Sequence, residues 1–143
     1  MLLGTHTPKL DDKGRVILPS KFRDDLGSSV VVTRGQDRCL FLFSEKEFER
    51  QYEKIREAPL TNKNARGFQR MFLAGASAEK TDSQNRITIP PHLRTYASLE
   101  RELIVTGVGD HAEIWNADAW NAYAAGHEDV YSDMEEEVIP GLF

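Results

Sequence analysis

Short apolar runs separated by polar turns recur along the chain. The runs "RVIL" at 15–18 and "RITI" at 86–89 are rich in β-branched residues and therefore predict strands. Each run follows a polar tetrad, "DDKG" or "DSQN", whose composition is typical of a turn and whose last residue tolerates a positive φ. Residues 5–10 and 76–81 precede these turns and are predicted to be extended. Each tetrad is therefore expected to join two strands in a hairpin-like turn.

The same elements follow both turns in the same order. Pro19 and Pro90 end the second strand and suit the first turn of a helix, where a missing amide hydrogen costs little. Short helices are predicted over 20–26, with Gly27 as the stop, and over 91 to about 97. Two further apolar runs, joined by turn residues, come after each helix. Each copy is thus predicted to have the order β-turn-β-α-β-turn-β.

This order recurs because the sequence contains an internal repeat with an offset of 71 residues. The matched pairs are Gly4 and Gly75, Lys9 and Lys80, Asp11 and Asp82, Arg15 and Arg86, Pro19 and Pro90, and Arg23 and Arg94. A unit of about 45 residues buries too little of its surface to be stable alone. We therefore predict a mainly β, α+β protein in which the two repeats interleave their strands into one small barrel.

Helical periodicity fills the chain between and after the repeats. Ser44 and Glu47 form a capping box before a helix that Pro59 stops. A second helix is predicted from roughly Asn62 to Leu73, and a third over "NADAWNAYAAG". We divide the chain into a first repeat (5–47), a helical connector (48–75), a second repeat (76–119), and a C-terminal helix with an acidic tail (120–143).

Composition places the chain among globular proteins. The hydrophobic share is 40% and the charged share 29%, and no apolar run approaches the roughly 20 residues of a membrane span. The start "MLLGTHTPKL" lacks the basic segment and apolar block of a signal peptide. We therefore predict a cytosolic protein. The single cysteine, Cys39 in "RCLFLF", is expected to be a small buried hydrophobe and not a reactive thiol.

The net charge of −5 hides an asymmetry along the chain. Residues 1–73 contain 14 Lys and Arg against 10 Asp and Glu, whereas residues 74–143 contain 4 against 13. Six of those acids follow Ala125, in a segment without Lys or Arg. The rest of the chain can therefore carry a basic face that suits an anionic partner, because binding depends on local potential and not on the total charge.

The repeated motif is an Asp-x-x-x-Arg element, at 11–15 and 82–86, followed by an apolar strand and a proline. With the separation of its two copies, the intervening helices and "EIWNADAW", it makes the chain resemble the MraZ family of bacterial transcriptional regulators, from the start to about Tyr123. The resemblance implies a double AbrB-like (SpoVT-AbrB) fold, in which two swapped-hairpin units pack within one chain. It also implies sequence-specific binding to short direct repeats in the promoter of the division and cell wall gene cluster that begins with the family's own gene. The implied partners are double-stranded DNA, at the nucleoid, and further copies of the chain in a ring-shaped homo-oligomer.

Within this resemblance, Lys13, Arg15 and Arg86 are the candidate DNA-binding residues. Arg15 lies just past the turn, where its guanidinium can bind a guanine edge or a phosphate as a fork. Lys13 offers a point charge that suits phosphate. In the second copy Arg86 keeps the fork, while Gln84 replaces the lysine and retains hydrogen bonding without charge. We therefore expect the first copy to bind DNA more strongly, and the acidic tail to repel nonspecific DNA modestly.

Four further charged residues accompany these candidates. Asp11 and Asp82 can only accept hydrogen bonds, so we expect them to cap turn amides or to hold the arginine in place. Arg23 and Arg94 lie on the short helices, where they either contact phosphate or form an internal salt bridge. The alternative interpretation of both motifs is a solvated hairpin whose Asp and Arg merely pair across the turn.

Other function classes receive little support. His6, His92, His111 and His127 are scattered and lack the one-turn helical spacing of a metal site, and "GVG" at 107–109 lacks the third glycine of a dinucleotide-binding loop. We therefore predict no enzyme, no catalytic residues, no metal and no cofactor. A structural ring or an RNA binder on the same scaffold remains as an alternative, but the aromatic residues recur at matched repeat positions, which indicates core more than a platform for base stacking.

Overall fold

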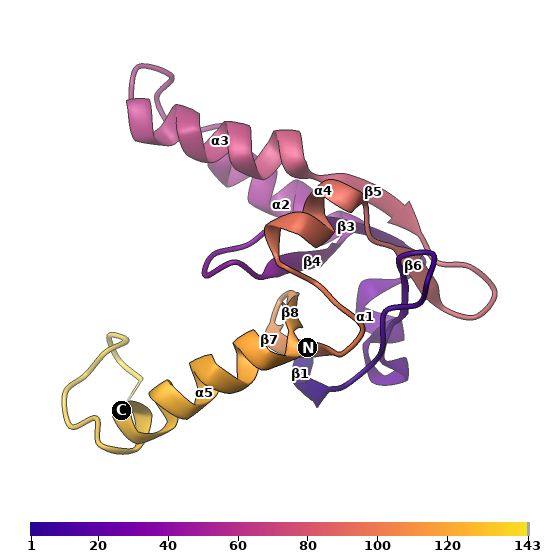
Figure 1. The fold of residues 1–143 in the computed structure, drawn as a ribbon. Helices are drawn as coiled ribbons and strands as arrows, with labels where there is room; N and C mark the ends of the chain where they lie inside the picture. Colours follow the sequence, from indigo (N-terminus) through magenta and orange to yellow (C-terminus); the bar gives the residue numbers. More distant parts are fainter. Residues whose placement is uncertain (143) are drawn as a thin grey trace.

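The computed structural model describes residues 1–142 (Figure 1). Each repeat contains four strands and a short helix in the predicted order. The strands are β1 (Leu2–His6), β2 (Arg15–Ile17), β3 (Ser29–Arg34), β4 (Leu40–Ser44), β5 (Ser77–Lys80), β6 (Arg86–Thr88), β7 (Leu103–Gly109) and β8 (Ala112–Asn116). The helices are the 3-10 turn η1 (Ser20–Phe22), α1 (Arg23–Leu26), α2 (Glu45–Ile55), α3 (Lys63–Gly75), α4 (Pro91–Tyr96) and α5 (Ala117–Ser132). The α+β class and the order of elements are thus confirmed.

The two repeats exchange strands. The larger sheet is antiparallel with the order β1-β7-β8-β4-β3-β5, so β1 of the first repeat pairs with β7 of the second, and β5 of the second pairs with β3 of the first. A smaller sheet pairs β2 with β6. The predicted interleaving is confirmed. Over residues 1–142 the larger ladder has β1 and β5 as its edges, so the described strands form a sheet and not a hydrogen-bonded closed barrel.

The polar tetrads reverse the chain, but the strands that flank them pair with the other repeat. Only β3 with β4, and β7 with β8, pair as hairpins within their own repeat. Val16 of β2 lies opposite Ile87 of β6, and each side chain is 1% exposed. Pairing across the repeats therefore directs both apolar side chains of the small sheet into the core, which local turn chemistry does not reveal.

One hydrophobic core is shared by both repeats. From the first repeat it contains Leu2, Leu10, Val16, Leu18, Phe22, Leu26, Val30, Val32, Leu40 and Leu42, and from the second Ile87, Ile89, Leu93, Ala97, Leu103, Val105, Ala112 and Ile114. Since each repeat supplies about half of the members, neither can bury its own apolar face alone. The core therefore fixes the position of one repeat relative to the other.

The connector helices α2 and α3 pack as a pair beside β3 and β4. Ser44 Oγ accepts a hydrogen bond from the amide of Glu47 at 3.1 Å, which caps α2 as predicted. Phe48 of α2 stacks on Phe72 of α3 with ring centroids 5.7 Å apart. The buried Thr33 of β3 donates from Oγ1 to the carbonyl of Phe72 at 2.6 Å. These contacts attach the helix pair to the sheet, from which it projects as an arm (Figure 1).

The last helix, α5, begins where predicted but is longer. Asn116 Oδ1 accepts from the amide of Ala119 at 3.1 Å and caps the helix. Trp115 and Trp120, with centroids 5.4 Å apart, attach its first turns to β8. The helix then continues through Gly126 to its end at Ser132, because a single glycine weakens a helix without forbidding it. The first part of the predicted acidic tail is therefore helical and forms a second arm (Figure 1).

Cys39 is fully buried, as the sequence predicted. Burial raises the pKa of its thiol, so the thiol stays protonated and packs as a small apolar side chain. None of the described helices is both long and apolar enough to cross a membrane.

Candidate nucleic-acid interface

The first motif is a turn organised by one carboxylate. Asp11 Oδ1 accepts hydrogen bonds from the amides of Lys13 (2.9 Å) and Arg15 (2.8 Å), and Asp11 Oδ2 accepts one from Arg15 Nε at 2.8 Å. The amide of Gly14 also donates to the carbonyl of Asp11 at 3.0 Å. Both oxygens of the carboxylate are therefore used, one on the backbone and one on the guanidinium.

The second motif repeats this geometry. Asp82 Oδ1 accepts from the amides of Gln84 and Arg86, both at 2.9 Å, and Asp82 Oδ2 accepts from Arg86 Nε at 2.7 Å. In both turns the carboxylate binds Nε and leaves the two terminal guanidinium nitrogens without a hydrogen-bond partner among residues 1–142. Each arginine is thus held through Nε, and its two terminal guanidinium nitrogens can bind another ligand.

The same hydrogen bonds set the acidity of the two carboxyl groups. The pKa of Asp11 lies below its ordinary value of 3.8, chiefly because the amide of Arg15 donates to the carboxylate, and its guanidinium adds to the effect. The pKa of Asp82 is lowered in the same way by Arg86. A depressed pKa means that the carboxylate stabilises its turn fully above pH 3.8, and that this contribution is lost only as the pH falls through the lower folded-state pKa.

We expect a carbon-13 titration of the Asp11 and Asp82 carboxyl groups to give midpoints below 3.8, where the ordinary group titrates. In Arg15→Ala the midpoint of Asp11 should rise but stay below that of an ordinary aspartate, because the two turn amides still donate. Asp82 in the same sample is the internal control and should not move. A midpoint of Asp11 at the ordinary value in the wild type would show that the turn is open in solution.

The strand pairing brings the two motifs onto one surface. In the β2–β6 ladder, Arg15 lies opposite Thr88 and Ile17 lies opposite Arg86. These four residues share the outer side of the small sheet because strand side chains alternate, and we call this surface the ribbon face. The two arginines are diagonal neighbours, about 7–8 Å apart at their Cα atoms, and their side chains are 29% and 23% exposed. The ribbon face therefore presents two guanidinium forks at a fixed spacing.

Cross-repeat hydrogen bonds lock the two turns together. The amide of Ile89 donates to the carbonyl of Gly14 at 2.8 Å, and the amide of Leu18 donates to the carbonyl of Asn85 at 3.0 Å. Asn85 Nδ2 also donates to the carbonyl of Leu18 at 3.2 Å. Gly14 and Asn85 have φ angles of 75° and 58°, as their turn positions predicted. The spacing between the two arginines is thus fixed by backbone and not by flexible loops.

Within residues 1–142, Arg94 does not form the internal salt bridge that was one of the two roles considered from the sequence. Its Nε donates to the carbonyl of Ile89 at 3.0 Å, and a Cβ at Gly14 would lie 3.0 Å from its guanidinium carbon. Arg94 therefore packs against the turn of the other repeat. Neither Arg23 nor Arg94 makes a salt bridge within residues 1–142.

Two members of the ribbon face were missed by sequence reasoning. Ile17 is 54% exposed and Thr88 is exposed, and each lies beside an arginine of the other repeat. The signal was present in the alternation of "RVIL", because Arg15 and Ile17 must face one side while Val16 and Leu18 face the core. An exposed isoleucine between two arginines gives the surface an apolar element as well as charge.

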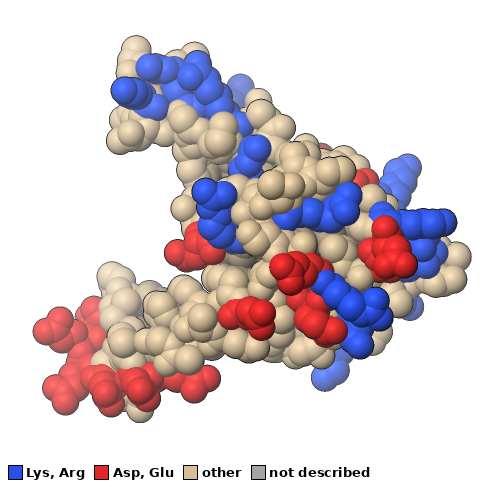
Figure 2. All heavy atoms as spheres, viewed as in Figure 1, with Lys and Arg blue, Asp and Glu red and all other residues tan. Residues whose placement is uncertain are grey.

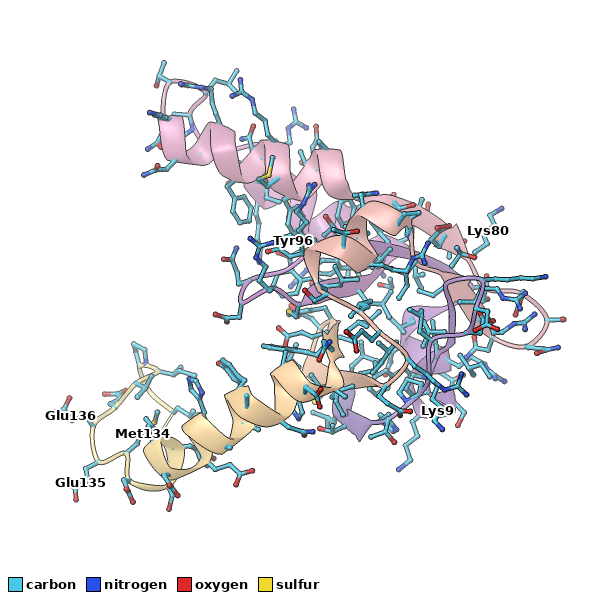
Figure 3. All side chains as sticks on the ribbon, in the orientation of Figure 1. Lys9, Lys80, Tyr96, Met134, Glu135 and Glu136 are labelled. Atoms are coloured by element: carbon cyan, nitrogen blue, oxygen red, sulfur yellow. The ribbon has the colours of Figure 1, made fainter. Side chains whose placement is uncertain are left out.

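Charge is distributed unevenly over the molecule. Lys and Arg gather at the end of the molecule that carries the two turns, and again along the α3 arm, whereas Asp and Glu gather around the end of α5 (Figure 2). Lys9 and Lys80, which are equivalent in the two repeats, lie at the same end as the turns (Figure 3). In the described part of the chain, no group of three or more His, Cys, Asp or Glu residues is placed to hold a metal ion.

Comparisons with known proteins place the chain among regulators. It matches a family model described as "MraZ protein, putative antitoxin-like" at residues 1–71 and again at residues 72–139. It is 58% identical over 143 residues to the transcriptional regulator MraZ of Leifsonia xyli subsp. xyli, and 57% identical to that of Clavibacter michiganensis subsp. michiganensis, with 100% of each chain covered. The corresponding protein of Micrococcus luteus is 50% identical over the same length. The two matches to one family model agree with the internal repeat.

Proposed function

The chain belongs to the MraZ family of transcriptional regulators, and we propose that it acts by binding duplex DNA through the ribbon face. The observation that carries the proposal is the pair of arginines held on one exposed surface by their own aspartates. The names of the relatives agree with a regulator of transcription and not with an enzyme.

The ribbon face has the dimensions and chemistry of a major-groove reader. The major groove admits a two-stranded β ribbon, and β2 with β6 forms such a ribbon. Arg15 and Arg86 each offer two terminal nitrogens that match the O6 and N7 acceptors of guanine. Ile17 supplies an apolar contact for a thymine methyl group, and Lys13 in the exposed turn reaches phosphate.

Few phosphates are within reach of one chain, so several chains act together. We propose a ring-shaped homo-oligomer whose copies bind short direct repeats, because linking several weak sites raises the overall affinity by orders of magnitude. Following the family resemblance, the operator lies in the promoter of the division and cell wall gene cluster that begins with the chain's own gene. The proposed location is therefore the cytoplasm, at the nucleoid.

The proposal is tested by the affinity of the wild-type chain for the DNA upstream of its own gene. Fluorescence anisotropy at fixed salt should show tighter binding to that DNA than to a shuffled duplex or to duplex RNA of the same length. Shifting one direct repeat by about half a helical turn, roughly 5 base pairs, should weaken binding because copies in one ring then face different sides of the duplex. Equal affinity for all four probes would contradict sequence-specific DNA binding.

A further inference from the structure

The helices α2 and α5 occupy equivalent positions in the two repeats, but only α2 is covered. α2 follows β4 and α5 follows β8, each after a side-chain N-cap. Phe48 of α2 packs on Phe72 of α3. Its counterpart Trp120 packs on Trp115 and Tyr123 and beside the buried cluster of Cys39 and Ile104, and its partners include no residue of α3 in the described part of the chain. From Ala125 to the end of α5 every residue is exposed. The second repeat thus has no equivalent of α3, the helix that covers α2 in the first repeat.

One face of α5 combines a glycine and an exposed valine with two acidic residues. Gly126, Asp129, Val130 and Asp133 follow one another at spacings of 3, 1 and 3 residues, which places them on one side of the helix. Val130 is 55% exposed, and the neighbouring Tyr131 is exposed as well. A short helix without tertiary contacts is marginal in water, and a glycine weakens it further. Within residues 1–142 the tail that follows lies beside this face, where Val130 lines a hollow with Met134 and Val138, and Val130 stays exposed. This half of α5 is therefore expected to need a further partner.

The charges on α5 specify what that partner carries. Asp129 and Glu128 lie in the last turns of the helix, near the negative end of its dipole, and no basic residue lies in the last turn. Glu135 and Glu136 extend outward from the tail that follows (Figure 3). A cationic partner would offset both the acidic side chains and the helix end.

The α3 arm carries the complementary pattern. Lys63, Gly67, Arg70 and Met71 follow at spacings of 4, 3 and 1 residues and lie on one side of α3, and Met71 is 55% exposed. Lys63 lies at the positive end of the helix dipole, and the first turn of α3 contains no acidic residue. Figure 2 shows the basic side chains along this arm and the acidic ones around the end of α5. α3 thus carries positive charge at its positive dipole end, and α5 carries negative charge at its negative dipole end. Each of these unfavourable arrangements would be offset by the charge of the other helix.

The glycines on these two faces point to a close approach between helices. Gly67 of α3 and Gly126 of α5 both lie inside a helix, and a Cβ at either position would meet nothing within 4 Å in the chain. No contact within residues 1–142 requires glycine there, although glycine weakens a helix relative to alanine. A second helix that packs against each position would give the missing side chain a function.

A groove beside α3 has the chemistry to receive an acidic, aromatic helix. It has a volume of about 300 Å³ and is lined by Arg34, Gln36, Gly67, Phe68, Met71 and Tyr96, among others. The guanidinium carbons of Arg34 and Arg38 lie 5.8 and 4.9 Å from the centre of the Tyr96 ring, so the rim is positive and the floor apolar. Tyr96 reaches the groove from α4 (Figure 3).

We propose that α5 of one copy of the chain packs along α3 and this groove of a second copy. The contact is head to tail, because two different surfaces meet, and such a contact repeats until the assembly closes on itself. It deepens the homo-oligomer of the proposed function by assigning its interface, and in that respect rests on it. The acidic end of the chain then has an assembly role that differs from the repulsion of DNA expected from the sequence.

Charge reversal on each side separately, followed by mixing, tests this contact. The acidic-side variant is Asp129→Lys with Asp133→Lys, and the basic-side variant is Lys63→Glu with Arg70→Glu. Each alone brings like charges together, and light scattering at micromolar concentration should show a particle mass at least twofold below that of the wild type. An equimolar mixture should assemble to a particle mass well above that of either variant alone, because a reversed α5 of one variant then meets the reversed α3 of the other, and a native α5 meets a native α3. This recovery also shows that both variants are folded.

The matched control for the acidic-side variant is Glu49→Lys with Glu100→Lys, which makes the same change in net charge at two exposed positions outside α3 and α5 and should keep the wild-type mass. Unchanged masses for both reversed variants would overturn the inference and leave DNA binding in place. Loss of DNA affinity by the basic-side variant at unchanged mass would overturn it too, by assigning α3 to DNA. A wild-type chain that is monomeric would overturn both the interface and the proposed oligomer.

Discussion

Replacing Arg15 by alanine is expected to weaken binding to the operator by about 1–3 kcal/mol for each copy engaged, and to reduce the preference for guanine at the contacted position. Arg15 is held through Nε by Asp11, at 2.8 Å, so its two terminal nitrogens are already oriented when DNA arrives. Alanine removes this fork without touching the backbone of the turn, because the amides that Asp11 binds remain. The measurement is anisotropy on the operator and on a duplex with that guanine replaced.

Lys13→Ala is the matched comparison within the same turn. Lys13 lies two residues from Arg15 and is exposed, but its ammonium suits phosphate and not a base edge. Its loss should weaken all sequences alike and reduce the slope of log affinity against log salt by about 1. Arg86→Ala should lose discrimination as Arg15→Ala does but with a smaller total loss, since Gln84 gives the second turn no charge. Wild-type discrimination in Arg15→Ala and Arg86→Ala together would exclude the ribbon face as the reader.

The sequence predicted the local parts of the fold because each rests on a short-range signal. Turn composition identified Gly14 and Asn85 as positions of positive φ, and both have it. The N-cap at Ser44 and the glycine stop at Gly27 are equally local, and both are present, although the Glu47 side chain binds Arg50 and Gln51 and not the amide of Ser44 that a capping box requires. The third helix was predicted only over "NADAWNAYAAG", whereas α5 continues past Gly126 to Ser132, because a glycine in a helix is a cost and not a break.

The parts that sequence could not supply depend on contacts between distant segments. The repeat predicted that strands interleave, but not that β1 would pair with β7 or β2 with β6. The shared surface of Arg15 and Arg86 follows from that register, and so does the packing of Arg94 on Gly14. The register of a strand pair depends on which side chains it buries across the whole core. Patterns read along one sequence do not show which distant strands pair, so they do not predict the register.

The strand exchange predicts that neither half of the chain folds alone. Residues 1–75 contain β1 and β2, whose partners β7 and β6 lie in the other half, and residues 76–143 contain β5, whose partner is β3. Each half would expose its share of the common core, and a unit of that size is marginal even with a core of its own. We expect each fragment to give the circular dichroism and narrow amide proton dispersion of an unfolded chain. An equimolar mixture should recover the spectrum of the intact chain.

The control is a circular permutant that opens the chain in the exposed loop between α2 and α3, near Leu60, and joins the original ends by a flexible linker. It also interrupts the chain between the two repeats, although before α3 and not after it, and it provides a new connection, so it should unfold cooperatively as one unit. A fragment of residues 1–75 that folds cooperatively alone would mean that β1 and β2 find partners within their own repeat. The spacing of Arg15 and Arg86 would then not be fixed by the fold, and a rigid two-pronged reader of DNA would lose its structural basis, because that rigidity comes from the exchanged strands.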